Sequence, residues 1–380
     1  MTRWLVLAAG LLACGGGADE GEYTVDIRTT EFGIPHIMAD DYFSAGVGVG
    51  YSLARDHLCI LGDQFVKVNS ERSRYYGPGD DDENLTSDFG WLGTGIRERA
   101  EDNFDSLDQP TRDMMSGYAE GYNRYLADTP EGDLDPRCAG ADWLEPIDAI
   151  DLFTYYNSLA LEGSGRNLLG FVATAQPPGF RNGQPPFPIP PREAFDDLRE
   201  PALASNGWGI GSERSESGRG MLLANPHFPS DGPLKLWEHH ITIPGELNVY
   251  GVGLLHAIVP LIGFNDAVAW THTVSPTPRF VIYKLDLDPA DPTRYQVDGE
   301  FLDMESTQYS IEVLRDGELQ TELRTLFRTI YGPMLNPPVA GWGGTVGYTY
   351  RDANEDNVNV IRTFLGAGRS QSLEEFEQNY

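Results

Sequence analysis

Side chains and glycines alternate along residues 206–211, which is the two-residue period of a β-strand. One face of this strand is bare, because every second residue is glycine, and the other face carries Asn206, Trp208 and Ile210. A polar stretch with glycines at 215–220 follows, and an apolar run then leads to His227. The pattern predicts two strands joined by a hairpin turn, with Ser205 at the start and His227 at the end. A bare face allows another group to approach the backbone closely.

Two short strands and a set of helices are predicted before this hairpin. Residues 24–27 and 34–38 have strand character and flank a turn at 31–33. Apolar residues then recur at helical spacing in three segments. The first runs through Leu58, Leu61, Phe65 and Val68, and the second begins after Asp108 with Pro110 in its first turn. The third follows Pro146 and ends near 163–165.

Strands dominate after the hairpin. The segments with strand character are 236–243, 247–255, 267–273, 279–287, 308–314 and 322–330. Asp316-Gly317 is a turn sequence between the last two of them. A helix opened by Ser372, with Glu375 three residues later, is predicted at the end of the chain. The pattern as a whole predicts an α+β fold.

Residues 177–191 hold seven prolines and two glycines. This composition supports neither a central strand nor an ordinary helix, so we predict a linker that leads towards Ser205. The alternative is a surface loop that stays intact.

An apolar run from Trp4 to Leu12 follows Arg3 and is too short to span a bilayer, which predicts an export signal. The sequence Leu-Leu-Ala-Cys at 11–14 is similar to a bacterial lipobox, in which Cys14 becomes the lipidated first residue of the mature protein. Ordinary signal cleavage near Gly17 or Ala18 is the alternative. Either route places the protein outside the cytoplasm, lipid-anchored on the periplasmic side of the envelope or secreted.

The chain is strongly acidic, with 58 Asp and Glu against 27 Lys and Arg and a net charge of −31. Such a charge repels phosphate backbones and anionic lipid surfaces, so nucleic acid is excluded as a partner and membrane contact is expected only through a lipid anchor. The acidic run at 80–83 lacks the spacing of a calcium loop and is predicted to be a solvated loop.

Three cysteines are present, and the lipobox accounts for Cys14. Cys59 and Cys138 remain as an even pair in an oxidising compartment, so we predict a disulfide between them. The alternative is two buried thiols.

Ser205 is a candidate nucleophile if a base activates it. A free α-amine, with a reference pKa of about 8, is a suitable base for a serine hydroxyl. Ser205 gains such an amine only when the bond from Ala204 to Ser205 is cut. On chemistry alone, the favoured interpretation of Ser205 is an ordinary loop serine at the start of a strand.

Several motifs together resemble the penicillin amidase family of N-terminal-nucleophile hydrolases, and in particular its acyl-homoserine lactone and aculeacin acylases. They are Ser-Asn at 205–206, Leu-Leu-Ala-Asn-Pro-His-Phe-Pro at 222–229, Gly-Phe-Asn at 263–265 and Ala-Trp-Thr-His-Thr-Val at 269–274. The resemblance extends from about Asp26 to the last residue.

The resemblance implies roles for particular residues. The Ser205 hydroxyl attacks the Ala204 carbonyl to cut the precursor, and the freed Ser205 then attacks the substrate. His227 hydrogen-bonds and orients Ser205, and the backbone N–H of Val274 is an oxyanion donor. Phe228 and Leu254 match positions that line the acyl pocket, although both could equally be core residues.

The family also implies a fold and a division of the chain. The expected fold is the four-layer αββα sandwich of N-terminal-nucleophile hydrolases, here incomplete at its C-terminal end, where the family's second oxyanion donor lies. We expect a signal at 1–13, a mainly helical α subunit at 14–181, a spacer removed on maturation at 182–204, and the strand-rich N-terminal part of a β subunit at 205–380. The two subunits are then each other's partners.

The implied reaction is hydrolysis of a linear amide that releases a long-chain acyl group from an amine, such as a homoserine lactone or a lipopeptide. A β-lactam acylase and a non-catalytic envelope lipoprotein are the alternatives. No cofactor is expected. No metal is expected either, because Ser-Pro-Thr-Pro stands at 275–278, where penicillin G acylases have calcium-binding carboxylates, and because adjacent His239 and His240 point to opposite faces of a strand.

Overall fold

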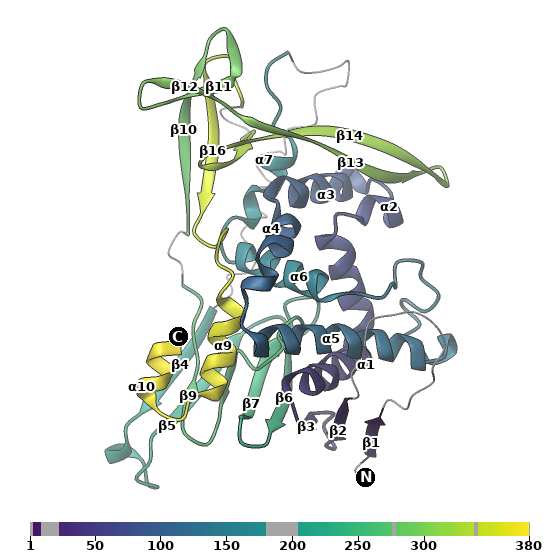
Figure 1. Cartoon of the computed structure of the whole chain (residues 1–380), viewed down its shortest axis with the longest axis vertical. Helices are drawn as coiled ribbons and strands as arrows, with labels where there is room; N and C mark the ends of the chain where they lie inside the picture. Colours follow the sequence, from purple (N-terminus) through teal and green to yellow (C-terminus); the bar gives the residue numbers. More distant parts are fainter. Residues whose placement is uncertain (1–2, 9–22, 180–203, 276–278, 338–340, 380) are drawn as a thin grey trace.

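The computed structural model describes residues 3–8, 23–179, 204–275, 279–337 and 341–379. A helical layer lies between two seven-stranded sheets, one at each end of the view in Figure 1, and a hairpin forms a separate two-stranded sheet. The mixture of helices and sheets confirms the predicted α+β class. Cys14 and the spacer residues 182–203 lie outside the described residues.

The first sheet has the strand order β1-β2-β3-β6-β7-β8-β9, and only the β3–β6 pair is parallel among its described strands. Its strands are β1 (Arg3–Ala8), β2 (Thr24–Thr29), β3 (Pro35–Ala39), β6 (Leu236–Ile243), β7 (Leu247–Leu254), β8 (Ile262–Phe264) and β9 (Ala269–Trp270). The strand expected at 267–273 is therefore much shorter than predicted. Its pairing with β8 stops at Trp270, where the chain leaves the sheet.

The three predicted helices are confirmed as α1 (Tyr42–Val68), α5 (Gln109–Asp128) and α6 (Ala149–Glu162). Each begins at an aspartate whose side chain accepts a backbone hydrogen bond from the first turn: Asp41, Asp108 and Asp148. The pattern did not reveal α2 (Arg72–Tyr76), α3 (Glu83–Thr94), α4 (Ile96–Asn103), α7 (Leu169–Ala173) and α9 (Val360–Arg369). The predicted acidic loop is a 3₁₀ turn at Asp80–Asp82, and Glu83 begins α3.

Helices α1 and α5 pack backbone against backbone. A Cβ atom built on Gly50 would lie 2.0 Å from the Tyr118 carbonyl oxygen, and one on Gly46 would lie 2.2 Å from that of Met114. The fit is reciprocal, because Cβ atoms on Gly117 and Gly121 would meet the carbonyl oxygens of α1 at 2.0 and 2.1 Å. Only glycine allows this separation of the two helices.

The largest hydrophobic core lies between this helix pair and one face of the first sheet. Alternate residues of β6 point into it, as the burial pattern of that strand shows. The core joins side chains from the sheet with those of α1, α5, α6 and α9, including Val25, Ile37, Ile241, Leu53, Tyr118, Phe153 and Leu365. The first sheet is thus supported by helices on one face.

The second sheet has the order β12-β11-β10-β16-β15-β14-β13. Its strands are β10 (Phe280–Asp288), β11 (Asp291–Val297), β12 (Glu300–Asp303), β13 (Glu305–Arg315), β14 (Glu318–Thr329), β15 (Gly332–Leu335) and β16 (Val346–Asp352). The predicted turn at Asp316-Gly317 joins β13 to β14, and the predicted C-terminal helix is α10 (Leu373–Asn379). Helices α3 and α7 cover part of this sheet (Figure 1), and the Arg324 guanidinium lies 3.9 Å from the centre of the Phe89 ring.

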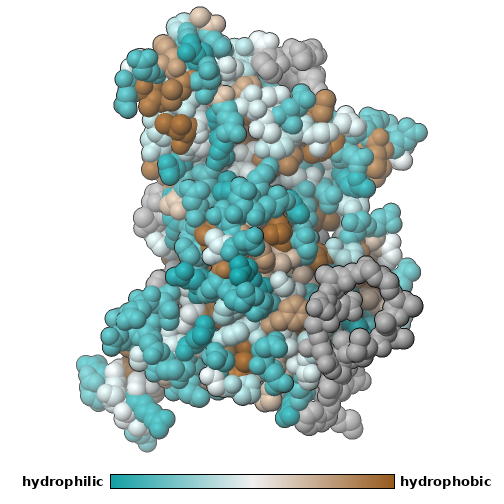
Figure 2. Space-filling view, in the orientation of Figure 1, coloured by the Kyte–Doolittle hydropathy of each residue, from teal (hydrophilic) through white to brown (hydrophobic). Residues whose placement is uncertain are grey.

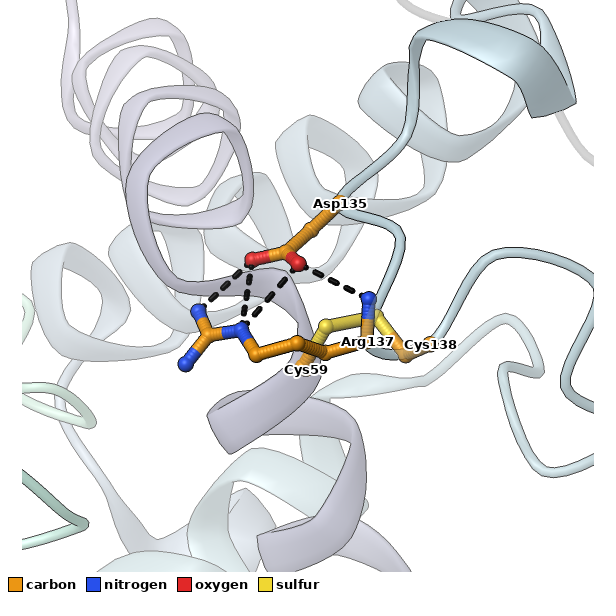
Figure 3. The surroundings of a disulfide bond; sticks show 4 residues. All are labelled: Cys59, Asp135, Arg137 and Cys138. Carbon is orange, nitrogen blue, oxygen red and sulfur yellow. Dashed lines mark hydrogen bonds and ion pairs between the residues drawn. A yellow bond between two sulfur atoms is a disulfide. The ribbon is translucent and has the colours of Figure 1, made fainter.

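The predicted disulfide between Cys59 and Cys138 is confirmed, with the two Cα atoms 5.5 Å apart. It attaches the loop before α6 to the side of α1 (Figure 3). In the same loop the Asp135 carboxylate accepts hydrogen bonds from the backbone and guanidinium of Arg137, and these hydrogen bonds lower the pKa of Asp135 to about 2. The disulfide thus attaches the loop to α1, and the Asp135–Arg137 pair lies within the loop itself.

Hydrophilic residues cover most of the face seen in Figure 2, as the acidic composition suggests. In the part of the chain that the structure describes, no helix combines the length and apolar character needed to cross a membrane. Residues Arg3–Ala8 of the predicted export signal form the edge strand β1. This pairing does not test whether the segment is removed, so the signal stays a prediction.

We predict that Gly50→Ala lowers the free energy of unfolding by about 2 kcal/mol, because overpacking at a backbone contact outweighs the better helix propensity of alanine. Urea unfolding followed by circular dichroism measures the change. Gly132→Ala is the matched control, since a Cβ atom there meets nothing within 4 Å. Equal midpoints for the two variants would contradict the proposed backbone contact.

Candidate active site

The predicted hairpin is present as β4 (Ala204–Ile210) and β5 (Met221–His227). Ala204 pairs with His227 and Ser205 pairs with Pro226 in the antiparallel register. The hairpin forms a separate two-stranded sheet, and large apolar side chains on it are exposed, including Trp208 (48%) and Leu223 (57%). An isolated hairpin of this kind is only marginally stable in water, so these side chains have the character of a packing surface.

A neighbouring segment of the chain contacts the bare face of β4 at Gly207. A Cβ atom built on Gly207 would lie 2.9 Å from the Cγ2 atom of Thr271. Thr271 belongs to the segment that follows β9 and ends at Val274, which is 42% exposed. The structure therefore brings the chain around Ser205 close to the start of the segment that carries the proposed oxyanion donor.

The Ser205 hydroxyl donates a hydrogen bond to the carbonyl oxygen of Ala204, with the two oxygen atoms 2.5 Å apart. The hydroxyl thus lies beside the carbonyl group of the bond that self-cleavage would cut. Ser205 is partly exposed, and Ala204 is exposed at the strand end, so water can reach this bond.

His227 does not form the predicted hydrogen bond to Ser205 in this uncleaved chain. Its Nε2 atom lies 3.0 Å from the side-chain nitrogen of Asn206 and 3.1 Å from that of Asn225. The reason is the two-residue period of the strands: His227 is paired with Ala204, so the side chain of Ser205, one residue further on, points to the opposite face.

Asn206 and Asn225 are site residues that sequence reasoning did not single out. Asn206 and Asn225 are paired across the hairpin. Each lies two residues along its strand from the Ala204–His227 pair, so both side chains share the face of His227. Together the two side-chain amides hold the imidazole at its Nε2 atom. Alternation along β5 places Asn225 on the face of His227, whereas the position of Asn206 depends on the register across the hairpin.

The proposed acyl-pocket residues occupy two different places. Phe228 directly follows β5 and is half-buried, and Leu254 is the half-buried last residue of β7, where it pairs with Leu236. Cavities of about 310 and 230 Å³ lie among the helices rather than beside Ser205. The assignment of Phe228 and Leu254 to an acyl pocket stays a prediction.

Asn265, in the Gly-Phe-Asn motif, connects the β8–β9 turn to α9. Its side-chain nitrogen donates to the carbonyl oxygens of Gly368 (2.9 Å) and Ser370 (2.8 Å), and its side-chain oxygen accepts from Ala267 and Val268. The last carbonyls of a helix need such partners. This motif residue therefore fixes the strand that leads to Thr271.

The histidines of β6 point to opposite faces, as predicted. His239 is fully buried beside Trp237, and burial lowers its pKa to about 3. His240 faces the other way, and its Nδ1 atom lies 3.0 Å from that of His36. Within the described ranges, no three His, Cys, Asp or Glu side chains are grouped closely enough to hold a metal ion.

The chain matches one protein family over most of its length. The model of the family described as penicillin amidase matches residues 24–380. The chain belongs to the penicillin amidase family.

Two of its curated relatives share more than a third of their aligned residues with the chain. An acyl-homoserine lactone acylase PvdQ of Pseudomonas fluorescens is 39% identical, and the match covers 97% of this chain and 49% of that protein. Aculeacin-A acylase of Actinoplanes utahensis is 35% identical, with 94% of this chain and 47% of that protein covered. The chain thus spans about half the length of the curated relatives it matches.

A solved structure of a thermostable penicillin G acylase from Alcaligenes faecalis is also similar. Its TM-score is 0.40 at 21% sequence identity, and the match covers 46% of this chain and 30% of that one.

We predict that Asn265→Asp lowers the free energy of unfolding by about 1–3 kcal/mol, because a carboxylate replaces the two N–H donors that face carbonyl oxygens. Chemical unfolding at neutral pH measures the change. Asn359→Asp makes the same change at an exposed helix N-cap without a side-chain cap hydrogen bond, and it should leave the unfolding midpoint nearly unchanged. Equal losses in the two variants would show that the Asn265 contacts contribute nothing.

Proposed function

We propose that this chain is part of an amide hydrolase that matures by cutting its own Ala204–Ser205 bond. The observation that carries the proposal is the Ser205 hydroxyl, 2.5 Å from the oxygen of the carbonyl it would attack, on the hairpin that begins with the family's Ser-Asn motif. Membership of the penicillin amidase family supports it independently.

The self-cleavage step uses atoms of the chain and water. The Ser205 Oγ atom attacks the Ala204 carbonyl carbon and loses its proton, the bond from that carbon to the Ser205 nitrogen breaks, and the nitrogen takes up a proton. Water then hydrolyses the resulting ester. The products are a carboxylate on Ala204 and a free α-amine on Ser205.

The freed α-amine supplies the base for the second reaction. At neutral pH an amine with a pKa of about 8 is partly unprotonated, so it can accept the Ser205 hydroxyl proton when that oxygen attacks an amide substrate. The backbone N–H of Val274 is proposed to donate to the oxyanion. The contact between Thr271 and Gly207 supports this role, because it places the same segment against the nucleophile strand.

His227 is proposed to act beside the acyl group. Ala204 is its cross-strand partner in the uncleaved chain, so cleavage vacates the position opposite the imidazole. In the second reaction the acyl carbon of the substrate bonds to the Ser205 Oγ atom. The Ala204 carbonyl carbon had bonded to the same atom during self-cleavage. His227, held by Asn206 and Asn225, is then proposed to hydrogen-bond Ser205 or the acyl group once Ser205 is a free chain end.

The proposed substrate is a linear amide with a long acyl chain on a small amine or a lipopeptide. The names of the two relatives support this class, because one is described as an acyl-homoserine lactone acylase and the other as an aculeacin-A acylase. Hydrolysis rates for amides of increasing acyl length would separate this substrate class from β-lactam amides with short aromatic side chains.

The four-layer αββα sandwich is proposed as the complete fold. The helix-covered first sheet supplies one α and one β layer, and the exposed apolar residues of β4 and β5 supply a surface for further packing. After maturation the two chains are proposed to remain associated. Hydrogen bonds between the two segments support this association. The Tyr118 hydroxyl donates to the carbonyl oxygen of Leu255, and the Arg324 guanidinium donates to the carbonyl oxygen of Ala173.

Export and lipid anchoring through Cys14 are proposed on the lipobox sequence. The confirmed disulfide between Cys59 and Cys138 supports an oxidising compartment. Ordinary signal cleavage, which gives a protein without a lipid anchor, is the alternative.

We predict that Ser205→Ala abolishes both precursor cleavage and amide hydrolysis, because one hydroxyl performs both attacks. Denaturing gels and N-terminal sequencing follow cleavage in protein expressed from the complete gene, and release of the free amine from a long-chain N-acyl substrate follows hydrolysis. Ser205→Cys keeps a nucleophile and should retain some cleavage. Ser230→Ala, at an exposed loop serine, should behave as wild type.

The proposal requires a new chain that begins Ser-Asn-Gly at residue 205. A wild-type protein that remains in one piece and hydrolyses no acyl amide would contradict it and favour a non-catalytic envelope protein.

We predict that Cys14→Ser moves the protein from the membrane fraction to the soluble fraction, because serine cannot receive the thioether-linked lipid. Fractionation and metabolic labelling with a fatty acid measure this. If the variant stays in the membrane fraction, Cys14 is not the anchor.

A further inference from the structure

Asn206 is followed directly by Gly207 on the strand that carries Ser205. An asparagine can lose its side-chain amide without an enzyme when the backbone nitrogen of the next residue attacks the side-chain carbonyl carbon. Glycine hinders this attack least, because it has no Cβ atom beside its nitrogen. Asn225, the partner of Asn206 across the hairpin, is followed by Pro226, which has no N–H and cannot react in this way.

The register of the hairpin turns the Gly207 N–H away from β5. Pairs in an antiparallel ladder alternate between those that exchange two hydrogen bonds and those that exchange none. Ser205 is paired with Pro226, which lacks the N–H that a hydrogen-bonded pair needs, so this pair exchanges none. Gly207 and Ala224, two residues further on, form a pair of the same kind. In the described part of the chain, no other strand pairs with that edge of β4.

The two residues are open to solvent, and the strand end can move. Asn206 and Gly207 are both exposed, so hydroxide and water can reach them. The attack requires the backbone of Asn206 to rotate out of the extended conformation. This rotation breaks the 3.0 Å contact with His227 and the pairing at the end of a two-stranded sheet, which is only marginally stable in water. Because Gly207 lies against Thr271, the rotation moves only the strand end before it.

We propose that Asn206 is a site of spontaneous deamidation. Hydroxide removes the Gly207 N–H proton, and the nitrogen bonds to the Asn206 Cγ atom. The side-chain nitrogen takes up a proton from water and leaves as ammonia, which regenerates hydroxide. Water then opens the five-membered succinimide ring at one of its two carbonyl carbons. The product at position 206 is an aspartate or an isoaspartate.

Both products alter the surroundings of His227 and Ser205. A carboxylate oxygen replaces the side-chain nitrogen that lies 3.0 Å from Nε2 of His227, which puts a negative charge beside the imidazole. Isoaspartate also adds one carbon atom to the backbone between Ser205 and Gly207, which shifts the pairing of Ser205 with β5. The modification therefore limits the lifetime of the candidate site. Its chemistry goes beyond the amide hydrolysis proposed for Ser205 and does not depend on it.

Peptide mapping of the whole chain by mass spectrometry tests the proposal. The Ser205→Ala variant is incubated at neutral and at mildly alkaline pH, so that the chain stays uncut whether or not self-cleavage occurs. The mass gain from replacing an NH₂ group with OH should appear at Asn206 and not at Asn225. An isoaspartyl methyltransferase should methylate the same peptide. The rate should rise with pH, because hydroxide removes the proton that starts the reaction.

Three further variants test the mechanism. Asn206→Gln should abolish the modification, since glutamine would have to form a less favourable six-membered ring. Gly207→Ala should slow it at least about tenfold, because a Cβ atom hinders the attacking nitrogen and restricts the backbone. Pro226→Gly supplies the missing N–H after Asn225 in a pair that exchanges no hydrogen bonds, and Asn225 should then lose its amide as well.

The proposal is overturned if Asn206 in the folded chain keeps its amide for about ten times as long as the urea-unfolded chain needs to lose it. Equal rates at Asn206 and Asn225, or an unchanged rate in Gly207→Ala, would also overturn it. A modification that is confined to Asn206, rises with pH and is absent from Asn206→Gln supports it, provided that the circular dichroism spectrum stays native.

Discussion

The close contact between α1 and α5 determines how the rest of this structure is built. Glycines four residues apart on each helix let the two backbones meet, and the paired helices then form one rigid support for the first sheet. The same contact positions Tyr118, whose hydroxyl donates to the Leu255 carbonyl just beyond β7 at 2.8 Å. A helix from the first part of the chain thereby fixes a strand that follows the proposed cleavage point. Cutting the chain at Ser205 leaves this support intact.

The two-residue period of the hairpin explains which part of the site the sequence could predict. Alternating glycines predicted β4, its bare face and the hairpin, because these depend on neighbours in the sequence. The partner of His227 depends on register across the hairpin. A register with Ala204 opposite His227 places Asn206 and Asn225 beside the imidazole and turns Ser205 away. Motif order alone contains no information about this register.

Long-range packing accounts for the elements that the sequence did not reveal. Helix α3 begins directly after an acidic 3₁₀ turn, and it packs against the second sheet through Leu85, Phe89 and Leu92. The Arg324 side chain is nearly buried over Phe89, and burial lowers its pKa to about 10. A charged residue in a strand gives no indication from sequence that it will cover an aromatic ring. The disulfide was predictable because only two cysteines remained to pair.

The proposed chemistry lies on the element that the described part of the chain packs least. Most residues of β4 and β5 are exposed, whereas α1 and α5 are almost entirely buried along their shared face. An exposed strand end permits what the proposed reaction needs, because Ala204 must leave, water must reach the ester and Ser205 must be free to turn towards His227. The contact of Gly207 with Thr271 limits this freedom to the end of the strand. Two residues after Ser205 the backbone is already fixed against the segment that leads to Val274. Cleavage can therefore free the nucleophile without moving it away from its proposed oxyanion donor.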